Sequence, residues 1–171
     1  MKYITLFCFA IFSLNSVAQN NLYTIDSTFA TFLEENHPNI IFNGSLNLDN
    51  LSEINSLNIS NTPVNNIDGI QFFENLESLT IHNCYALGNI EITGLINLSQ
   101  LNIINNNGTD TINISGLSNL NELILSDLLS LDILNISELP NLYDLTIIYA
   151  GITDLNLSEL PNLNYLKFHQ S

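Results

Sequence analysis

The sequence predicts a β-rich solenoid of about five coils, each 21 or 22 residues long, preceded by a capping helix. Three observations support this fold class. A six-residue pattern with aliphatic residues at its first, fourth and sixth positions recurs at intervals of 10 or 11 residues along most of the chain. Two patterns together give full similarity at 21 or 22 residues, and a period of that length is typical of solenoids. Hydrophobic residues make up 46% of the chain, which is enough for a packed core and excludes disorder.

The first 18 residues have the features of a secretory signal peptide. Lys2 supplies the positive charge, residues 4–14 form the apolar segment, and Ser16-Val17-Ala18 is a small-residue cleavage site. The apolar segment is shorter than the run of about 20 residues that a transmembrane helix needs. We therefore expect cleavage after Ala18, a secreted or cell-surface protein, and no membrane insertion.

An N-terminal cap is expected over residues 19–45, with a short helix over about residues 27–36. Asp26 or Ser27 can begin this helix, because either side chain can accept a hydrogen bond from the first turn. Its apolar face is formed by Phe29, Phe32 and Leu33. A helix this short is marginal by itself, so we expect it to cover the first coil of the solenoid.

The solenoid is expected over residues 46–171, with an open C-terminal end. The fourth and sixth positions of each pattern are inward-facing residues of a short strand, since alternate side chains of a strand point to opposite faces. Each coil then has a front strand and a rear strand, and equivalent strands of successive coils lie parallel. The leucines expected in the core of the front strands are Leu79, Leu101, Leu123, Leu145 and Leu166. One coil cannot bury its leucines alone, so only the stack is stable.

Asparagine recurs in two registers of the repeat. One register lies at the corner before each front strand and consists of Asn75, Asn97, Asn119, Asn141 and Asn162. We expect these side-chain amides to bind the backbone of the turns. The other register lies on the expected rear strands and consists of Asn113, Asn135 and Asn156. Each of these three is followed two residues later by serine, which also matches a glycosylation acceptor, but hydrogen bonding along the strand face is favoured.

The repeat pattern resembles that of leucine-rich repeats, and its 22-residue coils, with Ile152-Thr153-Asp154-Leu155, are similar to those of internalins. Residues 25–79 resemble the start of secreted leucine-rich repeat proteins of the Bacteroidetes, in the helix, in residues 56–61 and in residues 67–76. Members of these families act as extracellular binding or adhesion scaffolds, and the resemblance implies such a role here.

The chain departs from the family at one position of the repeat. The asparagine that usually follows the second leucine by five residues is kept as Asn106. At the equivalent positions the chain has Thr62, Cys84, Leu128 and Ala150. Cysteine is an accepted substitute in such repeats, so we expect Cys84 to be a buried core thiol. It is also the only cysteine after residue 18, which leaves no partner for an intrachain disulfide.

The net charge of the chain argues against nucleic acids and anionic membranes as partners. Once the signal peptide is removed, Lys167 is the only lysine or arginine against 17 aspartates and glutamates. Nucleic-acid binding requires clustered basic residues, and anionic membrane surfaces attract them, so neither partner is expected. The acidic residues are scattered, as on a solvated surface.

Motifs for catalysis are also missing. His37, His82 and His169 are widely separated and lack metal-ligand spacing, and no phosphate loop or nucleophile motif occurs. We therefore expect no catalytic residue, no cofactor and no metal. Residues 105–110 are rich enough in oxygen to suggest a calcium loop, but they lack its acidic residues, so an ordinary turn is favoured.

The remaining candidate site is the outward face of the front strands. Two expected columns of outward residues run Thr80, Asn102, Ile124, Thr146, Lys167 and His82, Ile104, Ser126, Ile148, His169, with Tyr143, Tyr149 and Tyr165 beside them. Exposed apolar and aromatic clusters mark interaction sites. The candidate ligand-binding residues are Tyr143, Tyr165, Ile124, Ile148 and Ile104. Alternatively, a loop covers the isoleucines or sheet propensity alone selected them.

Two functions follow from these observations. The first is a non-enzymatic extracellular recognition module that binds a protein or a glycan through the outward face of its repeat strands. The alternative is a structural or adhesive surface repeat protein, or a fragment of a larger exported protein. In that alternative the chain pairs end to end through the free edge of its C-terminal strand, residues 166–168.

Overall fold

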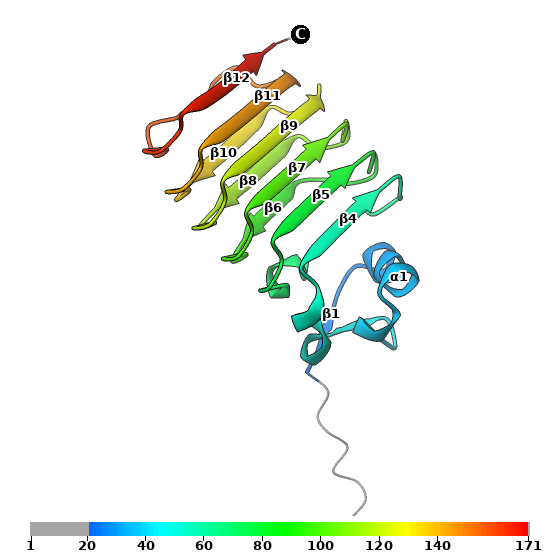
Figure 1. Cartoon of the computed structure of the whole chain (residues 1–171). Helices are drawn as coiled ribbons and strands as arrows, with labels where there is room; N and C mark the ends of the chain where they lie inside the picture. Colours follow the sequence, from blue (N-terminus) through cyan, green and yellow to red (C-terminus); the bar gives the residue numbers. More distant parts are fainter. Residues whose placement is uncertain (1–20, 171) are drawn as a thin grey trace, which may run out of the picture.

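The computed structural model describes residues 21–170 and shows a parallel-stranded solenoid with a helical cap at its N-terminal end (Figure 1). The expected signal peptide and its cleavage site lie outside the described residues. In chain order the elements are β1 (Leu22–Thr24), α1 (Ser27–Asn36), the 3-10 helix η1 (Pro38–Ile40), β2 (Ile41–Phe42), β3 (Ser45–Asn47), the 3-10 helix η2 (Leu48–Glu53), β4 (Ser56–Ser60), the 3-10 helix η3 (Ile70–Phe72), β5 (Ser78–His82), β6 (Ile90–Thr93), β7 (Gln100–Ile104), β8 (Thr111–Ser115), β9 (Glu122–Leu128), β10 (Ile133–Ser137), β11 (Asp144–Ala150) and β12 (Tyr165–His169).

The cap is built around α1, which confirms the expected capping helix. Asp26 caps its first turn, accepting hydrogen bonds from the backbone N–H groups of Thr28 at 2.8 Å and Phe29 at 3.3 Å. The hydroxyl of Thr28 also donates to Asp26, and this bond is the main cause of the lowered pKa of the Asp26 carboxyl. The same hydroxyl oxygen accepts from the backbone N–H of Asn65 at 2.9 Å, which ties the helix to the first coil.

The front sheet has six parallel strands in the order β12-β11-β9-β7-β5-β4. Equivalent residues of successive coils are register partners, as the 22-residue period predicts. The leucines at the second position of four central strands are fully buried, and they are Leu79, Leu101, Leu123 and Leu145. The rear sheet is smaller, with three parallel strands in the order β10-β8-β6, and the space between the two sheets is the core.

Leu166 does not share the burial of these leucines, although it was expected in the same core. Leu166 is the register partner of Leu145, yet 47% of its surface is exposed, and Phe168 two residues later is 42% exposed. The reason is that β12 is the outermost strand of the front sheet, and within residues 21–170 no further strand pairs with it. The inward direction of a side chain is therefore not enough to bury it.

The rear strand expected around residues 155–157 is also missing. Residues 151–164 contain no strand, and Leu155 and Leu157 are only half-buried. This coil is one residue shorter than the others, because Asp144 pairs with Glu122, 22 residues earlier, but with Tyr165, 21 residues later. The missing residue falls between β11 and β12, in the segment that would have to pair with β10.

The asparagines at the front corner bind the backbone as expected. Each donates its side-chain amide to a carbonyl of the preceding coil: Asn75 to Ser52 (2.8 Å), Asn97 to Glu74 (2.8 Å), Asn119 to Ile96 (2.8 Å), Asn141 to Ser118 (2.7 Å) and Asn162 to Pro140 (2.7 Å). On the rear sheet Asn135 donates to the Asn113 side chain at 2.8 Å. Asn156 instead accepts from the backbone N–H of Ser158 at 3.0 Å, since its segment is not a strand.

Candidate functional site

The front face, defined as the outward side of β5, β7, β9, β11 and β12, has the two columns of residues that the sequence predicts. In the first column the register partners are Thr80, Asn102, Ile124, Thr146 and Lys167 in order. In the second they are His82, Ile104, Ser126, Ile148 and His169. Adjacent strands lie about 4.8 Å apart, so residues 22 apart in sequence are immediate neighbours on this surface.

The three isoleucines of the front face lie on three successive strands, β7, β9 and β11. Each of Ile104, Ile124 and Ile148 is half-buried, so each keeps part of its surface accessible and no loop within residues 21–170 fully covers it. Ser126 is the register partner of both Ile104 and Ile148, and it lies two residues after Ile124 on β9. The isoleucines therefore surround one small polar residue and form a continuous surface.

Tyr143 and Tyr165 form an aromatic pair at the start of β11 and β12. Their ring centroids are 5.3 Å apart and the rings meet edge to face at 64°. Both side chains are exposed, and Asn164 donates its amide to the Tyr143 hydroxyl at 2.7 Å. Tyr143 also lines an open depression on the corner of the last coils, together with Asn121, Asn141, Pro161, Asn162, Leu163 and Asn164.

A second aromatic pair lies at the opposite end of the same two strands. Tyr149 and His169 are 5.3 Å apart between ring centroids and meet at 77°. Tyr149 is exposed. The sequence places Tyr149 beside the columns and His169 within one, but it does not predict that their rings meet. They do so because β12 pairs with β11 in a register that sets His169 opposite Ile148, next to Tyr149.

The backbone of Tyr149 is unusual. It has a φ of 52°, in the left-handed region, at a position that recurs at the ends of β4, β5, β7, β9 and β11. The earlier coils have Asn61, Asn83, Asn105 and Asp127 there, with φ between 53° and 57°. Asparagine and aspartate tolerate this conformation, whereas a bulky residue in it is strained. The recurrence of Asn, Asn, Asn, Asp, Tyr at this position is visible in the sequence and could have identified Tyr149.

The three asparagines at these earlier positions are linked to each other by side-chain hydrogen bonds. Asn83 donates to the Asn61 side-chain oxygen at 2.7 Å, and Asn105 donates to that of Asn83 at 2.5 Å. Tyrosine has no amide with which to continue this chain of hydrogen bonds. The chain of hydrogen bonds already ends at Asn105, because Asp127 has no amide either, so the strained backbone is what distinguishes Tyr149.

Acidic residues surround the aromatic and apolar part of the front face. Glu122 and Asp144 are register partners on β9 and β11, and Asp127 follows Ser126 at the other end of β9. Gln100 donates to Glu122 at 3.1 Å. Lys167 on β12 is the only lysine or arginine in residues 21–170. The surface is consequently negative around an apolar centre.

Cys84 lies in the core, as the sequence predicts. It is fully buried, and its backbone N–H donates to the side-chain oxygen of Asn106 at 2.8 Å. The amide of Asn106 donates to the carbonyl of Ile81 at 2.9 Å. Burial raises the pKa of the Cys84 thiol, which makes it a poor nucleophile. The role of this pair is to hold adjacent coils together.

The oxygen-rich segment 105–110 is a turn whose amide oxygens already accept hydrogen bonds from the protein. The side-chain oxygen of Asn105 accepts from the Asn107 amide at 3.1 Å, and that of Asn106 accepts from the backbone N–H of Cys84. The side-chain oxygen of Asn107 accepts from the backbone N–H of Leu129 at 3.2 Å. This favours the ordinary turn over a calcium loop. Within residues 21–170 no three His, Cys, Asp or Glu side chains are placed to hold a metal ion.

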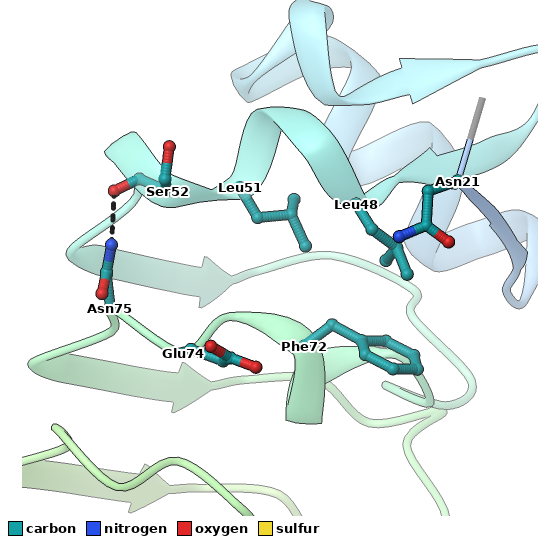
Figure 2. A pocket seen from close by; sticks show the side chains of 7 residues that line it. All are labelled: Asn21, Leu48, Leu51, Ser52, Phe72, Glu74 and Asn75. Carbon is teal, nitrogen blue, oxygen red and sulfur yellow. Dashed lines mark hydrogen bonds between the residues drawn. The ribbon is translucent and has the colours of Figure 1, made fainter. Parts of the chain in front are cut away.

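Another depression lies where the cap meets the first coil (Figure 2). Its lining consists of Asn21, Leu48, Leu51, Ser52, Phe72, Glu74 and Asn75. The corner hydrogen bond from Asn75 to the Ser52 carbonyl closes one end of it. The depression combines leucine side chains with a single carboxylate and includes none of the candidate ligand-binding residues, so it is the weaker candidate site.

Three comparisons with known proteins were made, and two of them found a match. The sequence model of the family described as the Endo-beta-N-acetylglucosaminidase EndoS LRR domain matches residues 44–150, more than half of the chain. Among solved structures, the chain is similar to an internalin (inlF) from Listeria monocytogenes, with 20% sequence identity and a TM-score of 0.37. That match covers 82% of this chain and 55% of the internalin chain. No curated protein matches the sequence.

None of the helices within residues 21–170 has the length and apolarity to span a bilayer.

Proposed function

The chain belongs to the EndoS family of leucine-rich repeat domains, and on this premise we propose that it is a non-enzymatic recognition module that binds a protein. The proposed binding surface is the front face of β7, β9, β11 and β12. Its central residues are Tyr143, Tyr165, Ile124, Ile148 and Ile104. The observation that carries the proposal is the exposed Tyr143–Tyr165 pair beside the isoleucine surface.

The chemistry of these side chains suits protein recognition. Tyrosine offers a large contact area and a polar tip at a low cost in conformational entropy, and it is enriched among the residues that dominate binding energy. Exposed apolar side chains that are contiguous indicate an interaction site, whereas scattered ones do not. The parallel register makes the isoleucines contiguous, which supports the proposal.

The first two strands of the front sheet provide an internal comparison. On β4 and β5 the outward residues are Ser56, Asn58, Ser60, Ser78, Thr80 and His82. Both parts have the same strand geometry, so sheet propensity acts on both alike. The concentration of isoleucine and tyrosine in the later coils therefore needs another explanation, and ligand binding provides one.

The proposal includes export. Cleavage after Ala18 would release a secreted or cell-surface protein that begins at Gln19. N-terminal sequencing of protein recovered from the medium or the cell surface should give Gln19 as the first residue. Recovery of a chain that still begins at Met1 would contradict this part of the proposal.

Affinity capture tests the binding site itself. Immobilised protein is incubated with an extracellular protein extract, and the capture is repeated with the double variant Tyr143→Ala, Tyr165→Ala and with the rear-face control Asn135→Ala. We expect the tyrosine variant to lose the captured protein, and the control to retain it, because Asn135 lies on β10 of the opposite sheet. If Asn135→Ala lost the captured protein and the tyrosine variant retained it, the binding site would lie on the rear sheet and the proposal would be wrong.

A glycan ligand is the main competing outcome of this test. An array of neutral and acidic oligosaccharides, probed with the same three proteins, would separate the two ligand classes. Tyrosine-dependent binding to the array, without capture of any protein, would replace the protein partner with a glycan at the same site.

The second candidate function is a structural or adhesive role through self-association. The observation that favours it is the exposure of Leu166 and Phe168 on β12, the outer strand of the front sheet. Exposed strand edges are templates for pairing with another chain. Light scattering during size-exclusion chromatography should then show a mass that rises with concentration, and Phe168→Asp should abolish the rise. A constant monomer mass would exclude this candidate.

A further inference from the structure

Tyr149 identifies a second anchor point on the proposed binding surface. Its left-handed backbone is strained for tyrosine, and four equivalent turns manage with asparagine or aspartate. The turn therefore does not need a tyrosine. Strained residues of this kind cluster at functional sites, where the surrounding structure offsets their cost. A role for the exposed ring, which is paired with that of His169, would explain why a tyrosine occupies this strained position.

The two aromatic pairs lie at opposite ends of β11 and β12. Tyr143 precedes β11 and Tyr149 lies near its end, and the six-residue separation corresponds to about 20 Å along an extended strand. Ile148 lies between the pairs on β11, with Ser126 beside it on β9. The surface between the two aromatic pairs therefore carries apolar and hydroxyl side chains. A surface of this shape fits an elongated ligand that follows the strand direction.

The charges around this surface restrict the charge of the ligand. Glu122 and Asp144 are adjacent at the Tyr143 end, and Asp127 lies at the Tyr149 end, so the acidic side chains are on β9 and β11. Lys167, the one basic side chain in residues 21–170, lies on β12 as the register partner of Thr146. Like charges opposite each other on neighbouring strands are unfavourable, and a cationic ligand would relieve that repulsion. The faces of the tyrosine rings also attract cations. An anionic ligand would be repelled at both ends.

Taken together with the proposed function, on which this step rests, these features define a partner. We infer that the chain binds a basic, extended polypeptide segment of about six residues, which lies along β9 and β11 between the Tyr143–Tyr165 pair and the Tyr149–His169 pair. Lysine or arginine side chains of the segment lie near Glu122 and Asp144, and its apolar side chains contact Ile124 and Ile148. Six residues span about 20 Å when extended, which matches the distance between the anchors.

Three pools of octapeptides test this inference. In every pool four alternating positions hold valine, threonine or tyrosine at random. The other four positions hold lysine or arginine in the basic pool, glutamate or aspartate in the acidic pool, and serine or asparagine in the neutral pool. Binding to the full chain is measured by fluorescence polarisation. We expect the basic pool to bind about tenfold or more tightly than the neutral pool, and the acidic pool not to bind.

Variants of the chain then localise the binding. Tyr149→Asn removes the second anchor while restoring the residue that earlier coils use, so it should weaken binding of the basic pool by about tenfold without lowering the urea midpoint. Tyr85→Ala is the matched control, since Tyr85 is exposed on an earlier coil. It should leave binding unchanged.

Charge variants separate a specific site from attraction by net charge. Glu122→Gln with Asp144→Asn removes two charges from the front face. Asp110→Asn with Asp132→Asn removes two from exposed positions just before the rear strands β8 and β10. The front pair should weaken binding by about tenfold and the rear pair by less than about twofold. Equal effects would mean that net charge alone attracts the peptides, and would overturn the inference.

The remaining outcomes distinguish this inference from the proposed function. Binding of the neutral pool as tight as that of the basic pool, still dependent on Tyr143, would overturn the basic partner and leave the front face as a binding surface. If no pool binds, an extended peptide is excluded, while the capture experiment with folded proteins still decides the proposed function. Insensitivity to both Tyr143→Ala and Tyr149→Asn would contradict both.

Discussion

The first and the last front strands have the same alternating pattern but lie in different surroundings. In β4, Leu57 is 1% exposed and Ile59 is fully buried, whereas the equivalent Leu166 and Phe168 of β12 are about half-exposed. The difference arises because the cap with α1 adjoins β4, while β12 is the outermost strand of the sheet (Figure 1). In a solenoid, therefore, burial of an inward side chain depends on the neighbouring coil and not on the pattern that directs it inward.

The largest expected effect comes from comparing equivalent leucines in the middle and at the open end. Leu145→Ala should lower the free energy of unfolding by about 2–5 kcal/mol, because it leaves a cavity in a closed core. Leu166→Ala should cost about 1 kcal/mol or less, since the side chain is already half-exposed. Thr146→Ala, an outward control on β11, should cost under about 0.5 kcal/mol. Equal losses for Leu145 and Leu166 in urea melts would mean that β12 is covered in solution.

Glycine substitutions test how tightly adjacent coils approach each other. A Cβ added at Gly108 would clash with the backbone carbonyl of Tyr85, and one added at Gly151 would clash with that of Leu129. Gly108→Ala should cost about 1–3 kcal/mol by overpacking. Gly151→Ala should cost less, because the last coil can move towards solvent. Gly88→Ala, where the added Cβ meets nothing within 4 Å, is the control and should change stability by about 0.5 kcal/mol or less in urea melts. A loss for Gly88→Ala as large as that for Gly108→Ala would contradict the close approach.

The cap can be weakened selectively through Asp26. Asp26→Ala should lower the free energy of unfolding by about 0.5–2 kcal/mol, because it removes the N-cap of α1. The folded-state pKa of Asp26 is lowered, so its contribution is complete above the ordinary carboxyl pKa of about 3.9 and is lost as the pH falls through the lower folded value. The wild type and Asp26→Ala should therefore converge in urea melts at acid pH. A difference that stayed constant down to pH 2 would exclude the charged cap as its cause.

The smallest expected effect contrasts the turns at the ends of β5 and β11. Tyr149→Asn should raise the free energy of unfolding by about 0.5–1 kcal/mol, because asparagine tolerates the left-handed backbone. The reciprocal change Asn83→Tyr should lower it, both by strain and by loss of the hydrogen bond to Asn61. Destabilisation by Tyr149→Asn in urea melts would show that the contact between Tyr149 and His169 outweighs the strain.

Much of the fold could be predicted because it repeats. The period placed the front strands, the outward columns and the corner asparagines, since each coil restates the same contacts with its neighbour. The exceptions lie at the end of the stack. Leu155 and Leu157 have the pattern of a rear strand, but a coil one residue shorter does not form it. Leu166 has the pattern of a core residue, but it lacks the covering neighbour.

The candidate site was predicted only in part. Tyr143, Tyr165 and the isoleucines follow from the columns, because their neighbours are fixed by the repeat length. The pairing of Tyr149 with His169 depends on the exact approach of β12 to β11, which a sequence pattern does not specify. The strain at Tyr149 likewise appears only once its φ is known.

By itself, the sequence determined the coil length, the direction of each strand residue, the acidic surface and the class of fold. Periodicity encodes these properties locally, through the alternation of strands and the spacing of turns. Only the tertiary structure decided which inward residues are buried, which aromatic rings meet and which turn is strained. These properties depend on distances between neighbouring coils, and such distances arise from packing rather than from any single repeat.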